Sequence, residues 1–547
     1  MKKMKKKRWL SAVLVLALAA VAAFSGCGGD AKTDGKDGES EEEGLQVIYN
    51  LGWGPSDPAQ PYLEPNYQYM RFIFNTPLVY NWIDREGKIG TDYLLAESVE
   101  PNENHTQFVI TLREGLKWHD GESLTADDLV FSQKFWAENP EASFEYFGVE
   151  SQPGTWVADD ERTVTVTYEE SYWNFLDFLD ETFYILPEHI FGGLDGTQFT
   201  EYKFEDGIPV GNGPFKYKES NADEYILLER FEDYYEPAEI QYLRLQLIDE
   251  DAIAVAAMQS GEIDVTATWD SNTTLLEADP TITVYKVPDN RVQGFWFNQS
   301  AEFLDDENIR KAIASLVNTE DLVQGALSGI GRPWEYAVPS FAAGYSDDLP
   351  TYATGVDEAK KYVEASGYTL GADGIYEKEG KKLSITWYDA YGEGSEINKA
   401  ILILQQEAKK AGIDLQVQEV DDDTWSKYKD EKSWTLLFDY FTGSPNVGSL
   451  VDEFRYASDP ERGHEVRWGP YFEEFNATID AAEAAYRAGD DETAVEKIRE
   501  VYTSLVDRAI FVPTWGYVNA YSANNRIDIS KSAYAEFSYL NRISAAK

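Results

Sequence analysis

The stretch from Phe108 to Ser132 constrains the fold of this chain most, because it predicts three consecutive local structures. Apolar and more polar residues alternate over 108–112, which is the period of a half-buried strand. The Asp120-Gly121 pair then predicts a turn. Thr125 is a favoured N-cap residue, and the two aspartates after it stand where a helix dipole stabilises negative charge. We therefore predict a strand, a turn and a capped helix.

Alternating helices and strands are predicted again in the second half of the chain. Residues 357–365 and 396–410 have the spacing of amphipathic helices. The strand-like runs 385–387 and 415–420 follow them. This order is typical of an α/β lobe, and 547 residues are too many for one core, so two or three domains or lobes are expected.

The residues that join the first strand to its helix carry a longer signature. Residues 112–121 read LREGLKWHDG and residues 124–128 read LTADD. Both closely resemble the signature of the family 5 extracellular solute-binding proteins, which are receptors of ABC importers. Further segments similar to this family are Leu94–Ser98, Leu186–Ile190, Pro209–Phe215, Glu262–Val265 and Gly294–Asn298. The resemblance covers about residues 45 to 545.

The resemblance implies an α/β fold of the periplasmic-binding-protein-like type II, with two α/β lobes, an extra subdomain and a hinge between the lobes. Lobe I is expected to comprise 45–65, 200–288 and 510–547. The extra subdomain is expected at 66–199, packed on lobe I, and lobe II at 289–509.

The first residues predict an exported lipoprotein. A basic segment precedes an apolar run from Trp9 to Phe24, which is shorter than the roughly 20 residues of a spanning helix. The sequence FSGC at 24–27 resembles a lipobox, which implies a signal peptide over 1–26 and lipidation of Cys27; a buried core cysteine is the alternative. Residues 27–44 are strongly polar and predict a disordered tether. We expect a location at the bacterial cell surface or in the periplasm, anchored to the membrane.

Composition excludes several classes of partner. The formal net charge of −51 disfavours nucleic acid and anionic membrane surfaces, because phosphates would be repelled. An acidic surface keeps an extracellular protein soluble and can also favour cationic solutes. Four widely separated histidines and a single cysteine predict no metal site and no internal disulfide, and no cofactor is expected.

The resemblance also implies a ligand site. In peptide-binding members an acidic residue near a tryptophan pairs with the ligand's ammonium group, and Asp439 follows Trp434 in this way. Asp439 stands six residues before Pro445, whereas the family pattern places the acid four residues before a proline. The predicted ligand-binding residues are Tyr67, Gln68, Trp296, Asn298, Trp434, Asp439, Tyr440, Trp515 and Tyr517.

The expected function is capture of a peptide between the lobes and its delivery to the transmembrane subunits of an ABC permease, by a monomer and without chemistry on the ligand. An oligosaccharide is the alternative ligand, because 15 Trp, 35 Tyr and 27 Phe residues offer many rings that stack on sugars. Transfer of ligand information to a sensor is a further alternative. A surface-anchored glycoside hydrolase is an alternative of another class, and it would need two carboxylates that face each other.

Overall fold

The computed structural model describes residues 45–52, 61–63, 74–142, 154–221, 224–268, 271–534 and 537–547. The predicted signal peptide, Cys27, the tether, Tyr67 and Gln68 lie outside these ranges.

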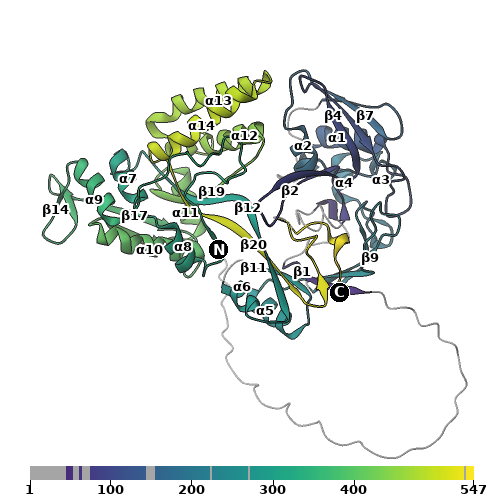
Figure 1. The fold of residues 1–547 in the computed structure, drawn as a ribbon. Coiled ribbons are helices and arrows are strands. Elements are labelled where there is room, and N and C mark those ends of the chain that lie inside the picture. The colour runs from purple at the N-terminus through teal and green to yellow at the C-terminus, as the bar shows by residue number, and fades with distance from the viewer. Residues whose placement is uncertain are drawn as a thin grey trace, which may run out of the picture. The chain divides into compact units, whose positions relative to one another are not determined.

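A nine-stranded mixed sheet holds the described part of the chain together (Figure 1). Its strands follow the order β19-β12-β20-β11-β1-β10-β9-β8, and β13 pairs with β20 beside this path. The strands are β1 (Gln46–Asn50), β8 (Phe215–Asn221), β9 (Tyr225–Arg230), β10 (Tyr242–Gln246), β11 (Val265–Thr268), β12 (Ile282–Phe297), β13 (Arg332–Pro333), β19 (Leu436–Thr442) and β20 (Phe511–Asn524).

Two long strands, β12 and β20, belong to both lobes. Residues 282–288 of β12 pair with 518–524 of β20 in lobe I, where β20 also pairs with β11. Further along, β12 pairs with β19 and β20 pairs with β13 in lobe II. The predicted boundary between 288 and 289 therefore falls inside β12, and the two lobes share a continuous pair of strands.

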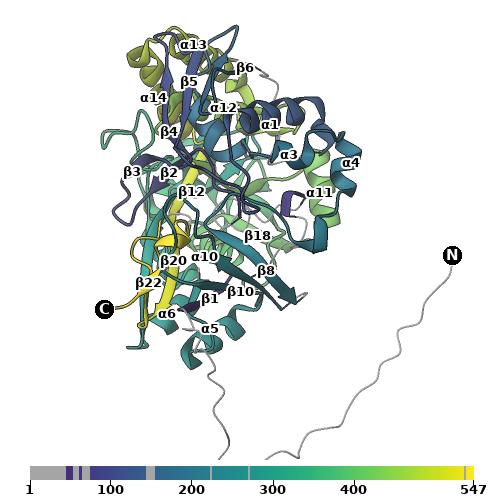
Figure 2. The same ribbon diagram turned by 90° about the vertical axis from the view of Figure 1, so that its right-hand side faces the viewer.

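Lobe I packs helices α5 (Asp251–Ser260) and α6 (Ser271–Glu277) next to the strands that follow them in sequence (Figure 2). Helix α5 ends at Gly261, which adopts the left-handed conformation with φ of 77°, as is common for a glycine after a helix. On the sheet, Leu243 and Leu245 of β10 are fully buried in the core of this lobe.

The extra subdomain contains the four-stranded sheet β4-β5-β7-β6 and the hairpin β2-β3. Phe108, Ile110 and Leu112 point into its core, which confirms the predicted half-buried strand. Thr125 caps the next helix, and the Asp128 carboxylate accepts the Thr125 backbone N–H at 2.8 Å. The elements are β2 (Val79–Ile83), β3 (Ile89–Tyr93), β4 (Ala96–Pro101), β5 (Gln107–Leu112), α1 (Ala126–Glu138), β6 (Thr155–Ala158), β7 (Thr163–Thr167), α2 (Phe175–Asp177), α3 (Glu188–Phe191) and α4 (Gly196–Glu201).

Lobe II has a hydrophobic core on each side of its part of the large sheet. The predicted alternation is confirmed, because β17 and β18 are parallel neighbours joined through α10. Its further elements are α7 (Glu307–Ala314), α8 (Thr319–Ala326), α9 (Val356–Ala365), β14 (Thr369–Leu370), β15 (Tyr376–Lys378), β16 (Lys381–Lys382), β17 (Ser384–Asp389), α10 (Glu396–Lys410), β18 (Asp414–Glu419), α11 (Asp422–Asp430), α12 (Val447–Ser458), α13 (Phe472–Arg487) and α14 (Asp491–Asp507). No helix in the described ranges has both the length and the apolar character that a bilayer span requires.

Hydrogen bonds connect the extra subdomain to lobe II at the start of α12. The Asp177 carboxylate accepts hydrogen bonds from the Ser449 hydroxyl and, at 3.2 Å, from the Asn446 amide. The Asn174 amide donates to Asp452 at 3.0 Å. Burial raises the pKa of Asp177, although its hydrogen bonds oppose the shift. These contacts bring the side of lobe II that carries α12 next to the extra subdomain.

Candidate functional site

The candidate site lies where β12 and β20 pass from one lobe to the other. The pairing of β12 with β20 is interrupted between Pro288 and Val292, so residues 289–291 have no partner on β20. A second irregularity follows at Gly294. Any other residue there would place its Cβ atom against the Phe511 ring. Such irregularities redirect side chains, and glycine permits the close approach of the neighbouring strand. The hinge strands therefore present side chains at this point that a regular sheet would not.

Arg291 is the centre of the first group of side chains at the hinge. Its guanidinium contacts the Asp289 carboxylate through two hydrogen bonds, of 3.0 and 2.5 Å. The Arg291 Cζ atom lies 5.0 Å from the centroid of the Tyr517 ring and 5.5 Å from that of Tyr440. The Tyr517 hydroxyl donates to Gln293 Oε1 at 2.8 Å. Burial opposes the charge of Arg291, but Asp289 outweighs it and raises the pKa of the guanidinium.

Asp439 is the centre of the second group. One carboxylate oxygen lies 3.1 Å from Nη2 of Arg467, and the other accepts the Tyr440 backbone N–H at 2.9 Å. Arg467 is 3% exposed, with its Cζ atom 5.0 Å from the Trp296 ring centroid, whereas 30% of the Asp439 side chain is exposed. A carboxylate has about four acceptor positions, so Asp439 has acceptor capacity left on its exposed side.

Together the two groups offer charged and aromatic side chains that can recognise a ligand. Tyr440 follows Asp439 on β19, so the two side chains leave opposite faces of the strand, and the half-exposed Tyr440 ring lies near Arg291. The exposed part of Asp439 suits a cationic group, and the Tyr440 and Tyr517 rings suit planar or apolar groups. The structure thus brings three of the predicted residues, Asp439, Tyr440 and Tyr517, to the same end of lobe II.

Glu453 of α12 accepts the backbone N–H of Thr442 at 3.1 Å, beside this site. Burial raises the pKa of Glu453 to about 7, and the negative charge of Asp439 adds to this rise. The hydrogen bond from Thr442 and the positive charge of Arg467 lower the pKa in part. Because the pKa in the folded state lies above the unfolded value of 4.5, folding favours the protonated form. The contribution of Glu453 to the stability of the folded state should therefore fall as pH rises from about 4.5 to about 7.

Glu453→Gln should remove this dependence. We expect the variant and the parent to have similar stability near pH 4.5, and the variant to be more stable by roughly 3 kcal/mol at pH 8. Thermal melts at both pH values measure the difference. Glu461→Gln, at an exposed position, is the matched control and should show no such change. An equal effect of Glu453→Gln at both pH values would contradict the assignment.

Four other predicted residues are packed inside lobe II. Trp296, Asn298, Trp434 and Trp515 are between 0 and 3% exposed. The Asn298 amide donates to the backbone carbonyls of Lys432 and Trp434. In this structure these side chains stabilise the lobe, and protein atoms surround them.

The structure adds three residues that the sequence reasoning missed, namely Arg291, Glu453 and Arg467. The sequence does contain a signal for Arg291. Two residues of opposite charge, Asp289 and Arg291, stand on either side of Asn290 directly after a strand-like run, and such a pair can form a local ion pair. Arg467 carries no comparable signal, since it reaches Asp439 from 28 residues away. Only the packing of the segment after α12 against β19 places this charge.

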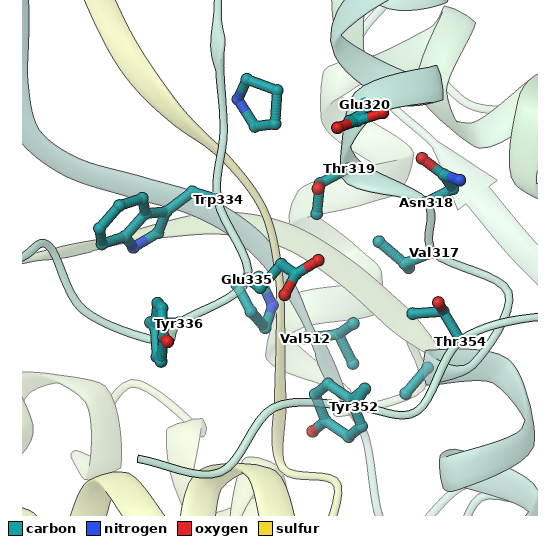
Figure 3. A pocket seen from close by; sticks show the side chains of 13 residues that line it. Val317, Asn318, Thr319, Glu320, Trp334, Glu335, Tyr336, Tyr352, Thr354 and Val512 are labelled. Carbon is teal, nitrogen blue, oxygen red and sulfur yellow. The ribbon is translucent and has the colours of Figure 1, made fainter. Parts of the chain in front are cut away.

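A cavity of about 400 Å³ lies elsewhere on lobe II, next to α8 (Figure 3). Figure 3 shows the Trp334 and Tyr336 rings on one side of the cavity and Asn318 and Thr319 on the other. None of the predicted site residues lines it. The cavity is therefore separate from the two groups at the hinge.

The chain is similar to several known binding proteins in sequence and to several solved structures in fold. The oligopeptide-binding protein AppA of Bacillus subtilis is 24% identical over 407 residues, which are 72% of this chain and 73% of AppA. Its structure with a nonapeptide matches with a TM-score of 0.66 and 20% identity, over 92% of this chain and 99% of AppA.

Two further structures match over most of their length. The ABC transporter substrate-binding protein CtaP of Listeria monocytogenes has a TM-score of 0.76 and 21% identity, over 92% of this chain and all of CtaP. A mannohexaose-bound oligopeptide-binding protein of Thermotoga maritima has a TM-score of 0.63 and 22% identity, over 89% of this chain and 93% of that protein. The predicted two-lobed type II binding-protein fold is confirmed.

The family model for bacterial extracellular solute-binding proteins, family 5, matches residues 92–459, which is more than half of the chain. The matched range contains the signature at 112–128, β12, β19 and Asp439. Members of this family are extracytoplasmic binding components of transport systems. The chain therefore belongs to the family 5 extracellular solute-binding proteins.

Proposed function

We propose that this protein captures a peptide at the hinge between its lobes and delivers it to the transmembrane subunits of an ABC permease. Asp439 receives the α-ammonium group of the peptide, while Tyr440 and Tyr517 contact its backbone and side chains. Tyr67 and Gln68, which lie outside the described residues, are further proposed contacts of the ligand. The protein acts as a monomer and performs no chemical step on its ligand.

One observation carries this proposal, namely the partly exposed Asp439 carboxylate at the hinge end of β19. Its partner Arg467 compensates the charge in the free protein, and its exposed side remains open to a cation. The name of AppA, an oligopeptide-binding protein, supports a peptide as the class of ligand.

A thermal-shift screen tests the proposal. Residues 28–547, which include the whole unit from Gly44 to Lys547, are melted with pooled peptides and, separately, with pooled neutral oligosaccharides. A ligand at 100 times its Kd stabilises the folded state by about 2.7 kcal/mol, which raises the melting temperature measurably. Stabilisation by peptides is expected, and the absence of any response to peptides would overturn the proposal.

An oligosaccharide is the second candidate ligand. The half-exposed Tyr440 ring and the Tyr517 ring offer stacking surfaces for sugars, and the protein of Thermotoga maritima holds mannohexaose. Stabilisation by oligosaccharides alone would establish this alternative. Release of reducing ends from these sugars would instead indicate a hydrolase.

We also propose that Cys27 anchors the protein to the membrane after cleavage of residues 1–26. Cys27→Ser should abolish lipidation and shift the protein from the membrane fraction to the soluble extracytoplasmic fraction, because acyl chains supply the membrane affinity. Cell fractionation and the mass of the mature N-terminus measure both effects. Persistence of the serine variant in the membrane fraction would refute the anchor.

A further inference from the structure

The cavity beside α8 has the size and the lining of a ligand pocket, and the proposed function does not use it. Its volume of about 400 Å³ falls within the range of small-molecule sites, which is about 300–1,000 Å³. The buried apolar side chains of Ala314, Val317 and Val512 line it. The Trp334 and Tyr336 rings form one wall (Figure 3). The cavity can therefore bury the apolar body of a small ligand.

Thr319 is a second, independent feature that indicates a ligand. The residue is only 8% exposed, and it lines the cavity on the side opposite the Trp334 and Tyr336 rings (Figure 3). Its hydroxyl group has no hydrogen-bond partner among the described residues. Polar groups that are withdrawn from solvent are usually hydrogen-bonded. The Thr319 hydroxyl is therefore available to a ligand in the cavity.

The charges of the cavity favour a cation. Its lining contains the carboxylates of Glu320 and Glu335 and, within the described ranges, no lysine, arginine or histidine. Neither glutamate forms an ion pair with a described residue. In Figure 3 the Glu335 carboxylate lies between the aromatic wall and Thr319. Arg332 is close in sequence, but it lies over the Trp334 ring, with Cζ 4.2 Å from the ring centroid, and does not line the cavity.

The N-terminus of α8 also adjoins the cavity, and by itself it would favour an anion, because the helix dipole is positive there. Two features offset this preference. The Asn318 side chain caps the helix by accepting the Asp321 backbone N–H at 3.0 Å. The acidic residues Glu320 and Asp321 place two negative charges in the first turn. The balance of charge at this end of α8 is therefore negative.

We propose that the cavity beside α8 is a second ligand site, which binds a primary ammonium ion with an aromatic or apolar body. Glu320 and Glu335 pair with the ammonium group, and the Thr319 hydroxyl oxygen accepts one of its hydrogen bonds. An ammonium group has three N–H donors, for which two carboxylates and a hydroxyl are suitable acceptors. The apolar side chains contact the body of the ligand. This site is independent of peptide capture at the hinge.

Three probes of similar shape and different charge test the inference. They are phenethylammonium, neutral phenylethanol and anionic phenylpropanoate. Each is titrated into protein labelled with fluorotryptophan and followed by fluorine NMR, in which Trp334 reports on the cavity and is assigned with Trp334→Phe. Phenethylammonium should shift the Trp334 signal and bind about tenfold more tightly than phenylethanol, because only the cation pairs with the carboxylates. Phenylpropanoate should bind more weakly than phenylethanol.

Substitutions locate the charge and the hydroxyl. Glu335→Gln should weaken phenethylammonium about fivefold and phenylethanol less than about twofold, as expected for a partly exposed ion pair. Thr319→Val should weaken phenethylammonium about threefold without lowering the melting temperature, because the hydroxyl loses no described partner. Glu461→Gln, at an exposed position of lobe II, is the matched control. Asp439→Asn should leave the response of Trp334 unchanged, although Asp439 also suits a cation.

Each contrary result overturns the second site. Equal affinities for phenethylammonium and phenylethanol, or an equal loss of both in Glu335→Gln, would show that the carboxylates do not select a cation. Tightest binding of phenylpropanoate would assign the cavity to an anion at the N-terminus of α8. Loss of the Trp334 response in Asp439→Asn would assign the ammonium ion to the hinge, and no response to any probe would leave no ligand for the cavity. None of these results bears on peptide capture, which the thermal-shift screen tests separately.

Discussion

Asp439→Asn should weaken the binding of a peptide with a free α-ammonium group on the order of 100-fold or more. Truncating one partner of a hydrogen-bonded charge pair costs several kcal/mol, and each 1.4 kcal/mol is a factor of ten in affinity. The same peptide with an acetylated N-terminus should bind weakly to the parent, and the substitution should change its affinity little. Calorimetric titration of both peptides against both proteins measures the interaction between the carboxylate and the ammonium group.

A direct effect on binding must be separated from an effect on folding, because Asp439 also pairs with Arg467. Asp439→Asn leaves the buried guanidinium of Arg467 without its counter-charge, so the variant should melt at a lower temperature even without ligand. Asp439→Asn combined with Arg467→Gln removes both charges and should recover part of that stability without recovering peptide affinity. Recovery of affinity in the double variant, or unchanged affinity in the single one, would remove Asp439 from the site.

Arg310→Met should destabilise lobe II by roughly 3–5 kcal/mol and lower the melting temperature by about 10 °C. Arg310 is 1% exposed, and its guanidinium donates to the carbonyls of Leu304, Arg508 and Ala509 at distances of 2.7 to 2.9 Å. Methionine fills much of the same volume but leaves these buried acceptors unsatisfied. The cost arises from the unsatisfied acceptors as well as from the lost hydrogen bonds.

Arg462→Met is the matched control for this prediction. Half of its side chain is exposed, and it pairs with Asp459 at 3.4 Å, which is a surface contact worth at most about 1 kcal/mol. Arg310→Lys should recover only part of the stability, because an ammonium group cannot reach carbonyls on three sides as the planar fork does. A melting temperature within two or three degrees of the parent for Arg310→Met would contradict the structural role of Arg310.

Local elements were predictable because their signals are local. Thr125 caps α1 as expected, Gly261 ends α5, and the side chain of Ser395 accepts the Asn398 backbone N–H at the start of α10. The resemblance of residues 112–128 to a family signature added the two-lobed fold, which strand and helix periodicity alone did not specify. The same family resemblance pointed to Asp439 as a ligand-binding residue.

The ligand-facing side chains were less predictable, because the sheet of lobe II is covered on both sides. Residues 292–297 of β12 are all buried, so the apolar run shows no alternation that would reveal which side chains face the site. Trp296 was selected from such a run, and the structure packs it against Trp468 and Phe511. Tyr440, in contrast, lies at the edge strand β19 and remains half-exposed.

Several helices and strands, the family and the acidic residue on β19 could be predicted, because capping, periodicity and a continuous signature are each contained within a short segment. The charges that surround the site depend instead on tertiary packing. Arg467 reaches Asp439 across 28 residues, and Tyr517 reaches Gln293 across 224. Whether a charge is paired, as for Arg291, or unpaired, as for Arg332 among the described residues, depends on which distant strands become neighbours. No spacing within the chain specifies that arrangement.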